Sequence, residues 1–304
     1  MATDEQTCRQ ISHSHLEPMT GTAPHAPAWL LVEHSTAWTP KAPQGIPWPD
    51  EVQAQLQARL DATGVRIGLI RRVPAERHLT RRGPTQVLLI HTGPQRPWQR
   101  TTRIGEPAQL LDLDLAGLAA GHEPDLEQLD GPVLAVCTHG SRDACCARAG
   151  RPVATALAQR FGAAVWETSH VGGHRFAANL VCFPHGLMYG RAAEDTGRRI
   201  AQDYLEGRVS LDHYRGRTCW PAPVQAAEQH LRAELCATGL DEVTVLGWTP
   251  GDPTQVDLRA AGTTHRLLVQ TVPRPPARPF SCGSDKLEVP VDFAITEVRC
   301  QEAR

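Results

Sequence analysis

Two short stretches of this chain concentrate side chains that bind soft metals. Residues 137–146 read CTHGSRDACC, and residues 170–174 read HVGGH. Thiolate and imidazole ligands suit zinc or an iron–sulfur cluster, whereas magnesium and calcium require oxygen ligands. Two thiols from the first stretch and two imidazoles from the second would form a Cys2His2 set.

The elements that precede these stretches should hold them in place. Each stretch follows an apolar run that predicts a strand, at 132–136 and 163–166. Cys137 therefore stands at the end of a strand, and Cys146 directly precedes a predicted helix whose N-terminal amides can donate to sulfur. The two histidines flank Val-Gly-Gly, a turn that permits close backbone approach. Cys145 adjoins Cys146, and spacing alone does not choose between these two thiols.

A Cys2His2 set is compatible with two kinds of metal centre. A 2Fe–2S cluster needs four protein ligands, and two imidazoles can replace two thiolates. The replacement raises the reduction potential, and the remote imidazole nitrogens can take up a proton when the cluster is reduced. The same set also suits a tetrahedral zinc ion.

Residues 131–215 predict a thioredoxin-like α/β unit. The predicted order is strand, loop, helix, strand, loop, two strands and helix, with Pro-His-Gly at 184–186 as a hairpin turn. The ligand stretches would then lie in two loops at one end of the sheet. The helix should end at Gly162, and the last helix should cover 193–205.

The rest of the chain predicts two further regions and an arm. We expect a flexible N-terminal arm at 1–27, an α/β N-terminal domain at 28–130, the ligand domain at 131–215, and a C-terminal helix with an antiparallel meander at 216–304. The supporting patterns are strands at 29–34, 65–70, 85–91 and 98–104, a helix at 50–62, a linker at 208–223, a helix at 224–237, strands at 243–248, 255–259 and 265–272, and an edge strand at 289–298.

Composition narrows the class of protein. The formal net charge of the 304 residues is -2, which favours neither nucleic acid nor a membrane surface. No signal peptide and no apolar run of about 18 residues is evident, so we expect a cytoplasmic protein. The nine cysteines are odd in number and irregularly spaced, which predicts ligands and buried thiols but no disulfide framework. Five have no partner spacing and are expected to be structural or free: Cys8, Cys219, Cys236, Cys282 and Cys300. Cys282, in a glycine-containing loop, is the one that could approach the cluster.

Three motifs carry a resemblance to a known family. They are CTHGSRD at 137–143, HVGGHRFAAN at 170–179 and FPHGLMYG at 183–190, and WLLVEH at 29–34 also fits. The chain resembles the sucrase/ferredoxin-like family, most strongly over residues 130–207. The resemblance implies a thioredoxin-like ferredoxin with a 2Fe–2S cluster held by Cys137, Cys146, His170 and His174, and electron transfer as its activity.

The predicted function is therefore electron transfer, with proton-coupled redox chemistry, more in the manner of a carrier than of a stand-alone enzyme. A sucrase is not expected, because no carboxylate pair for glycoside hydrolysis is recognisable. No flavin or nicotinamide fingerprint is present, which predicts a separate redox partner protein, a reductase or an acceptor. One alternative is a zinc-stabilised thioredoxin-like binding module without redox activity. The other, a thiol oxidoreductase using Cys137, Cys145 or Cys146, is disfavoured because no Cys-x-x-Cys occurs.

Overall fold

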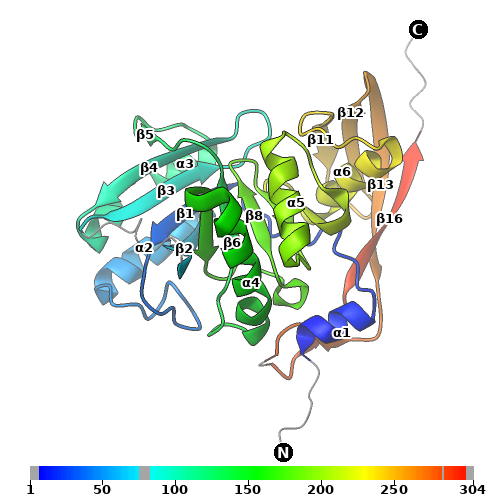
Figure 1. The fold of residues 1–304 in the computed structure, drawn as a ribbon. Coiled ribbons are helices and arrows are strands. Elements are labelled where there is room, and N and C mark those ends of the chain that lie inside the picture. The colour runs from blue at the N-terminus through cyan, green and yellow to red at the C-terminus, as the bar shows by residue number, and fades with distance from the viewer. Residues whose placement is uncertain (1–6, 75–82, 283, 299–304) are drawn as a thin grey trace, which may run out of the picture.

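The computed structural model describes residues 7–74, 83–282 and 284–298 of the chain. Figure 1 shows the arrangement of its elements. The helices are α1 (Cys8–Ser14), α2 (Asp50–Thr63), α3 (Leu115–Ala120), α4 (Ala144–Phe161), α5 (Glu194–Leu205) and α6 (Ala222–Leu235). The strands are β1 (Ala28–Glu33), β2 (Arg66–Arg72), β3 (Thr85–His91), β4 (Trp98–Ile104), β5 (Glu127–Gln128), β6 (Val133–Cys137), β7 (Val165–Thr168), β8 (Leu180–Phe183), β9 (Leu187–Tyr189), β10 (Tyr214–Arg217), β11 (Val243–Thr249), β12 (Thr254–Ala260), β13 (Thr263–Pro273), β14 (Arg278–Pro279), β15 (Leu287–Glu288) and β16 (Val291–Val298).

One large mixed sheet runs through the middle of the molecule. Its ten strands lie in the order β10-β9-β8-β6-β7-β2-β1-β3-β4-β5. The pairs β6–β7 and β1–β2 are parallel, and an antiparallel contact between β2 and β7 joins the two halves. The sheet thus continues across the boundary that we predicted between residues 28–130 and 131–215. The division into domains stays a prediction, while the mixed α/β class is confirmed.

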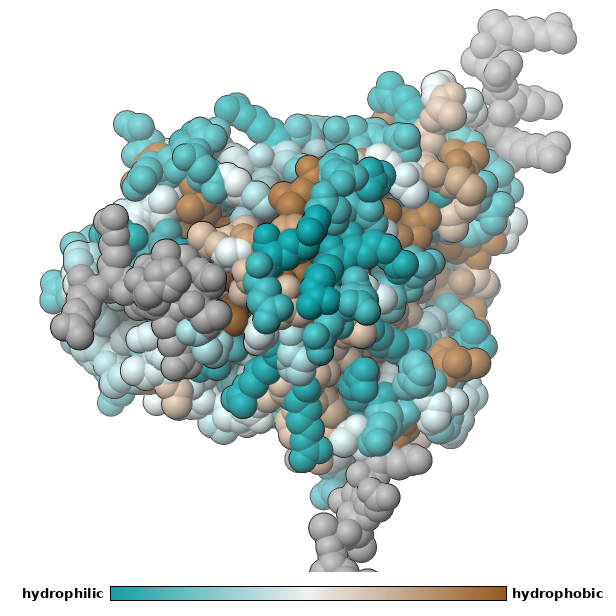
Figure 2. Space-filling view, in the orientation of Figure 1, coloured by the Kyte–Doolittle hydropathy of each residue, from teal (hydrophilic) through white to brown (hydrophobic). Residues whose placement is uncertain are grey.

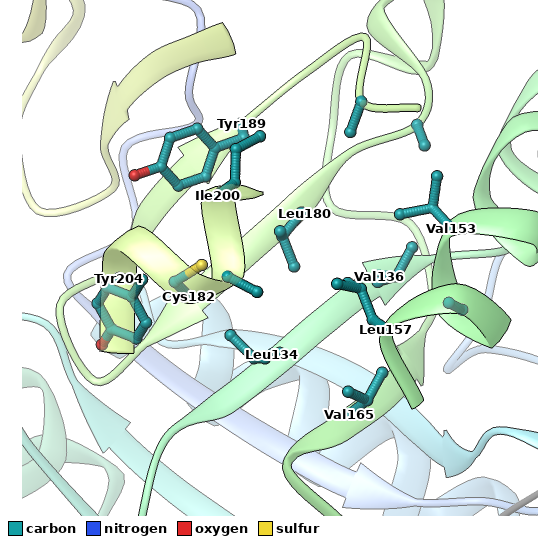
Figure 3. Close-up of a cluster of buried hydrophobic side chains, with 14 of the residues drawn as sticks. Leu134, Val136, Val153, Leu157, Val165, Leu180, Cys182, Tyr189, Ile200 and Tyr204 are labelled. Atoms are coloured by element: carbon teal, nitrogen blue, oxygen red, sulfur yellow. The ribbon is translucent and has the colours of Figure 1, made fainter. Parts of the chain in front are cut away.

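Alternation along the strands places side chains on both faces of this sheet. In β6, Leu134 and Val136 belong to a core formed with α4 and α5, which Figure 3 shows from inside. Cys137 lies with Val133 and Ala135 in a second core on the other face. The sheet curls around that second core, so Trp29 of β1 meets Phe183 of β8 with ring centroids 5.3 Å apart. Both faces are buried at the strand end that carries Cys137.

The helices over the second half of the sheet are amphipathic. Helix α5 buries Gly197, Ile200, Ala201 and Tyr204, and its remaining positions are largely charged or polar. The face of the molecule in Figure 2 is accordingly mostly hydrophilic, with hydrophobic colour confined to separate patches. Within the described ranges, none of the helices has the length and apolar character needed to cross a membrane.

The N-terminal segment packs against a loop that comes late in the chain. We expected a flexible arm at 1–27; residues 1–6 lie outside the described part of the chain, whereas residues 7–27 contain α1 with a capping box between Thr7 and Gln10 and bury Cys8 and Glu17. Helix α1 contacts β14 near the C-terminal end of the chain, and Figure 1 shows the blue helix beside the orange loop. The N-terminal segment is therefore packed against the body, because its cysteine and carboxylate have partners there.

Most predicted elements are present, and the differences are local. The four-stranded sheet β11-β12-β13-β16 has β16 at its edge, as predicted, and packs on α6. The linker expected at 208–223 is wrong in part, because β10 within it pairs with β9 and forms one edge of the large sheet. Strand β6 extends one residue further than predicted and ends on Cys137.

Two candidate metal centres

The first candidate centre consists of the four ligands predicted from sequence: Cys137, Cys146, His170 and His174. Three of them, Cys137, Cys146 and His170, each offer a ligand atom within 4.8 Å of the others. They come from the end of β6, the first turn of α4 and the loop after β7, which lie together because β6 and β7 are parallel neighbours. Cys146 Sγ lies 3.9 Å from His170 Nδ1.

A close helix–strand approach brings the two thiols together. A Cβ at Gly150 in α4 would stand 2.1 Å from the carbonyl oxygen of Cys137, so only glycine fits at this crossing. Asp143 caps the helix by accepting from the backbone N–H of Cys145 at 2.9 Å. The cap and the glycine together fix the helix start that carries Cys146.

The histidine loop requires two glycines and is held by hydrogen bonds from the side chains of Arg215 and Asn179. Gly172 and Gly173 have φ values of 98° and 70°, which favour glycine. The buried guanidinium of Arg215 donates to the carbonyl of Gly172 at 3.1 Å and to the side chain of Asn179 at 2.7 Å. Asn179 in turn donates to the carbonyl of Gly173 at 2.9 Å. This network sets the positions of the histidines on both sides of the turn.

His174 lies beside the other three residues and outside the close group. Its ring stacks on that of His170, with centroids 5.0 Å apart and planes at 28°. Its Nδ1 is buried and has no hydrogen-bond partner among the described residues, while its Nε2 lies 3.9 Å from Asp143 Oδ2. An unpaired buried nitrogen of this kind can serve as a ligand atom.

The surroundings of the first centre favour an ionised thiol. Cys146 donates to Cys137, which lowers the pKa of the Cys137 thiol despite its burial, and His170 lowers it further. The guanidinium of Arg66 donates to the carbonyl of His170 at 3.2 Å and, like Arg215, interacts favourably with a Cys137 thiolate.

His139 holds the histidine loop from its first residue. Its Nδ1 accepts from the backbone N–H of His170 at 3.0 Å, and its Nε2 lies 2.8 Å from the carbonyl oxygen of Thr39. These two contacts fit a neutral ring protonated on Nε2. Burial also lowers the pKa of His139, so the ring orients His170 without adding a charge.

The second candidate centre consists of Cys8, Asp143, Cys145 and Cys282. One ligand atom from each lies within 4.8 Å of the others. The Sγ–Sγ distances are 3.3 Å for Cys145–Cys282, 3.4 Å for Cys8–Cys282 and 3.7 Å for Cys8–Cys145. The carboxylate of Asp143 lies 3.8 Å from Cys8 Sγ. The spacing of the cysteines did not predict this group. The glycine-containing loop around Cys282 did point to that residue as a thiol that could approach the cluster.

The two neighbouring cysteines of α4 point to different centres. Cys146 groups with Cys137 and His170, whereas Cys145 groups with Cys8 and Cys282. Spacing left this choice open, and the geometry separates the two thiols. In the second group Cys8 donates to Cys145, which lowers the pKa of the Cys145 thiol to about 6, while burial raises the pKa of Cys282 to about 11.

Comparison with known proteins gives two matches. The family model for sucrase/ferredoxin-like proteins matches residues 19–216, about two thirds of the chain. A relative from Meyerozyma guilliermondii, named altered inheritance of mitochondria protein 32, is 32% identical over 101 residues. That alignment covers 30% of this chain and 36% of the relative, so the chain spans little more than a third of that protein's length. No solved structure matches. On the extent of the family match, the chain belongs to the sucrase/ferredoxin-like family.

Proposed function

We propose that Cys137, Cys146, His170 and His174 hold a 2Fe–2S cluster and that the protein transfers electrons. The observation that carries the proposal is the convergence of two thiols and two stacked imidazoles, one of which has a buried Nδ1 without a partner among the described residues. A thioredoxin-like reading of residues 131–205 is supported by the local order β7-β6-β8-β9, with a parallel pair beside an antiparallel hairpin.

The four side chains would supply the protein ligands of the cluster. Cys137, Cys146 and His170 lie together, and His174 would add a fourth ligand through its buried Nδ1. When bound, the cluster supplies a site that accepts and releases one electron. Arg215 is buried nearby, Arg66 is half-buried, and both would offset the negative charge that an added electron brings.

The remote nitrogens of the histidines support proton coupling. Nε2 of His174 faces the carboxylate of Asp143 at 3.9 Å. His170 lines a surface groove together with Arg142, Gln57 and Pro43, so one imidazole lies near the outside of the protein. An imidazole in that place is suited to exchange a proton with solvent and an electron with a separate redox partner protein.

A zinc-stabilised binding module without redox activity is the second candidate. It is favoured by the fact that Cys137, Cys146 and His170 alone lie within reach of a single ion, with His174 outside the close group. Acid-labile sulfide separates the two candidates, because a zinc site contains none.

The test is metal and sulfide analysis of protein purified anaerobically from iron- and zinc-replete cells. We expect about two irons and two sulfides per chain, with the visible absorption of an iron–sulfur cluster. Cys137→Ser should lose this iron and sulfide, whereas Cys236→Ser, at an exposed cysteine just after the end of α6, should keep both. Protein that contains no sulfide, with zinc that depends on Cys137, would replace the electron-transfer proposal with the binding module.

A further inference from the structure

The second candidate centre has the geometry of a binding site for one metal ion. Its three Sγ–Sγ distances are 3.3, 3.4 and 3.7 Å, so the sulfurs form a nearly equilateral triangle. Three thiolates bound to one tetrahedral zinc at about 2.3 Å would lie about 3.8 Å apart. Asp143 offers a carboxylate oxygen within 4.8 Å of all three sulfurs, 3.8 Å from Cys8 Sγ, which is close enough for a fourth ligand.

The distances do not select a disulfide. A sulfur–sulfur bond is about 2.05 Å long and joins two partners, whereas these three thiols are mutually close with no pair set apart. Cys8 and Cys145 are buried and Cys282 is exposed, so solvent reaches one corner of the triangle. An iron–sulfur cube would hold its thiolates on separate irons and hence further apart than a single ion does.

The carboxylate of Asp143 is buried with little positive charge to balance it. It accepts from the backbone N–H groups of Cys145 and Cys282, both at 2.9 Å, and from the hydroxyl of Ser281 at 3.2 Å. Among the described residues, the basic group paired with it is the imidazole of His174 at 3.9 Å, and no lysine or arginine forms an ion pair with it. A buried carboxylate beside three thiols is expensive without a cation, and a divalent ion would supply that charge.

The ligands come from three distant parts of the chain. Cys8 lies on α1, Asp143 and Cys145 lie at the start of α4, and Cys282 lies in the loop after β14. Cys8 and Cys282 are both outside residues 19–216, the part that the family model matches. The site therefore joins a region outside the family match to the helix that also carries Cys146.

We propose that Cys8, Cys145, Cys282 and Asp143 bind a single zinc ion that fastens α1 and the loop after β14 to the start of α4. Three thiolates and a carboxylate form a ligand set for zinc, and soft thiolates disfavour magnesium and calcium. Binding transfers no electron and displaces the remaining thiol protons to solvent. The site does not depend on iron at the first centre, since the two groups share no metal ligand.

The experiment measures zinc, iron and sulfide per chain in full-length protein from iron- and zinc-replete cells. Wild type and Cys236→Ser should carry about one zinc per chain. Cys8→Ser and Cys282→Ser should lower the zinc content about tenfold or more and leave iron and sulfide unchanged. Cys282→His should restore zinc, because imidazole replaces thiolate as a ligand; a merely structural role for Cys282 would not predict this rescue. X-ray absorption spectroscopy at the zinc K edge should show about three sulfurs at about 2.3 Å and an oxygen at about 2.0 Å from the metal.

Several results would overturn this site. The wild-type protein could contain no zinc, or zinc could persist at the wild-type level in Cys8→Ser and Cys282→Ser. Those variants could also lose copper or iron in place of zinc. Finally, mass spectra of protein kept from air could show a disulfide among the three cysteines. The first centre is tested separately, because Cys137→Ser should lose iron and keep zinc. The experiment can therefore refute the proposal for one centre and still support the proposal for the other.

Discussion

The two candidate centres share the start of α4 but are assembled on very different scales of sequence. The four residues of the first centre lie between positions 137 and 174, at the end of β6, in the first turn of α4 and in the segment after β7, the parallel neighbour of β6. The second centre joins Cys8 to Cys282, 274 positions apart, through Asp143 and Cys145. The first depends on strand order within one α/β unit, whereas the second depends on how α1 and the loop after β14 pack against that unit. The two adjacent cysteines of α4 therefore belong to different groups of candidate ligands.

Replacement of the two adjacent cysteines, one at a time, is the strongest test of whether the two centres are separate. Cys146→Ser should lose iron and sulfide about tenfold or more and keep zinc, and Cys145→Ser should lose zinc to a similar extent and keep iron. The physical reason is that each thiol faces a separate group of ligands. Elemental and sulfide analysis of both variants in parallel measures the effect, with Cys236→Ser as the control. Loss of both metals in both variants would mean that the two groups form one centre.

The sequence was informative where local rules apply. Strand ends predicted that Cys137, a thiol at 145 or 146 and the histidines would lie at one edge of the sheet, because parallel neighbours place their following loops there; the family resemblance chose Cys146. The strands 85–91 and 98–104 were predicted with the correct bounds, and the stop of α4 at Gly162 was also correct. The start of α4 was not, because the helix begins at Ala144, two residues before Cys146.

The second centre could not be predicted, for identifiable reasons. Residues 1–27 are polar and contain several prolines, which favoured a flexible arm, and α1 has only seven residues with no clear apolar period. Cys282 follows a proline-rich stretch with no periodic pattern. Its approach to Cys8 depends on long-range packing, such as the contact of Glu17 with Arg175 at 2.6 Å and with Arg278 at 3.5 Å. No spacing rule reports contacts of this kind.

A substitution at the helix–strand crossing should damage the first centre next most strongly. In Gly150→Ala the new methyl group would stand 2.1 Å from the Cys137 carbonyl oxygen, so α4 must move away from β6. We expect loss of most of the iron and a decrease in the free energy of unfolding of about 1–3 kcal/mol. Urea unfolding and iron analysis measure the two effects. Gly247→Ala is the matched control, because nothing lies within 4 Å of a Cβ built there. Wild-type iron content in Gly150→Ala would show that the crossing does not set the thiol positions.

Replacement of one imidazole ligand by a thiolate should lower the reduction potential of the first centre without loss of the cluster. In His174→Cys a neutral ligand becomes negative, so the reduction potential should fall by the order of 100 mV. In the wild type, reduction raises the pKa of the remote nitrogen, and the potential should therefore fall as pH rises by up to about 59 mV per unit between the oxidised and reduced pKa values. The variant should show a shallower slope in a potentiometric titration at several pH values. An unchanged slope would contradict imidazole ligation by His174, and His230→Cys on α6 is the control.

The smallest effect should come from a charge that touches no metal ligand atom. Arg66 is half-buried, donates to the His170 carbonyl at 3.2 Å and lies over the ring of Trp29 at 5.2 Å, so Arg66→Gln keeps a donor but removes the positive charge. Reduction adds a negative charge to the first centre, and its stabilisation by Arg66 is lost in the variant. The potential should fall by about tens of millivolts at unchanged iron content, because a charge beyond direct contact contributes of the order of 1 kcal/mol or less at a protein site. Zinc at the second centre should not change, and the exposed Arg259→Gln in β12 should leave both centres as in the wild type. A potential that rises or stays fixed in Arg66→Gln would mean that the positive charge acts on the fold of the loop and not on the reduced centre.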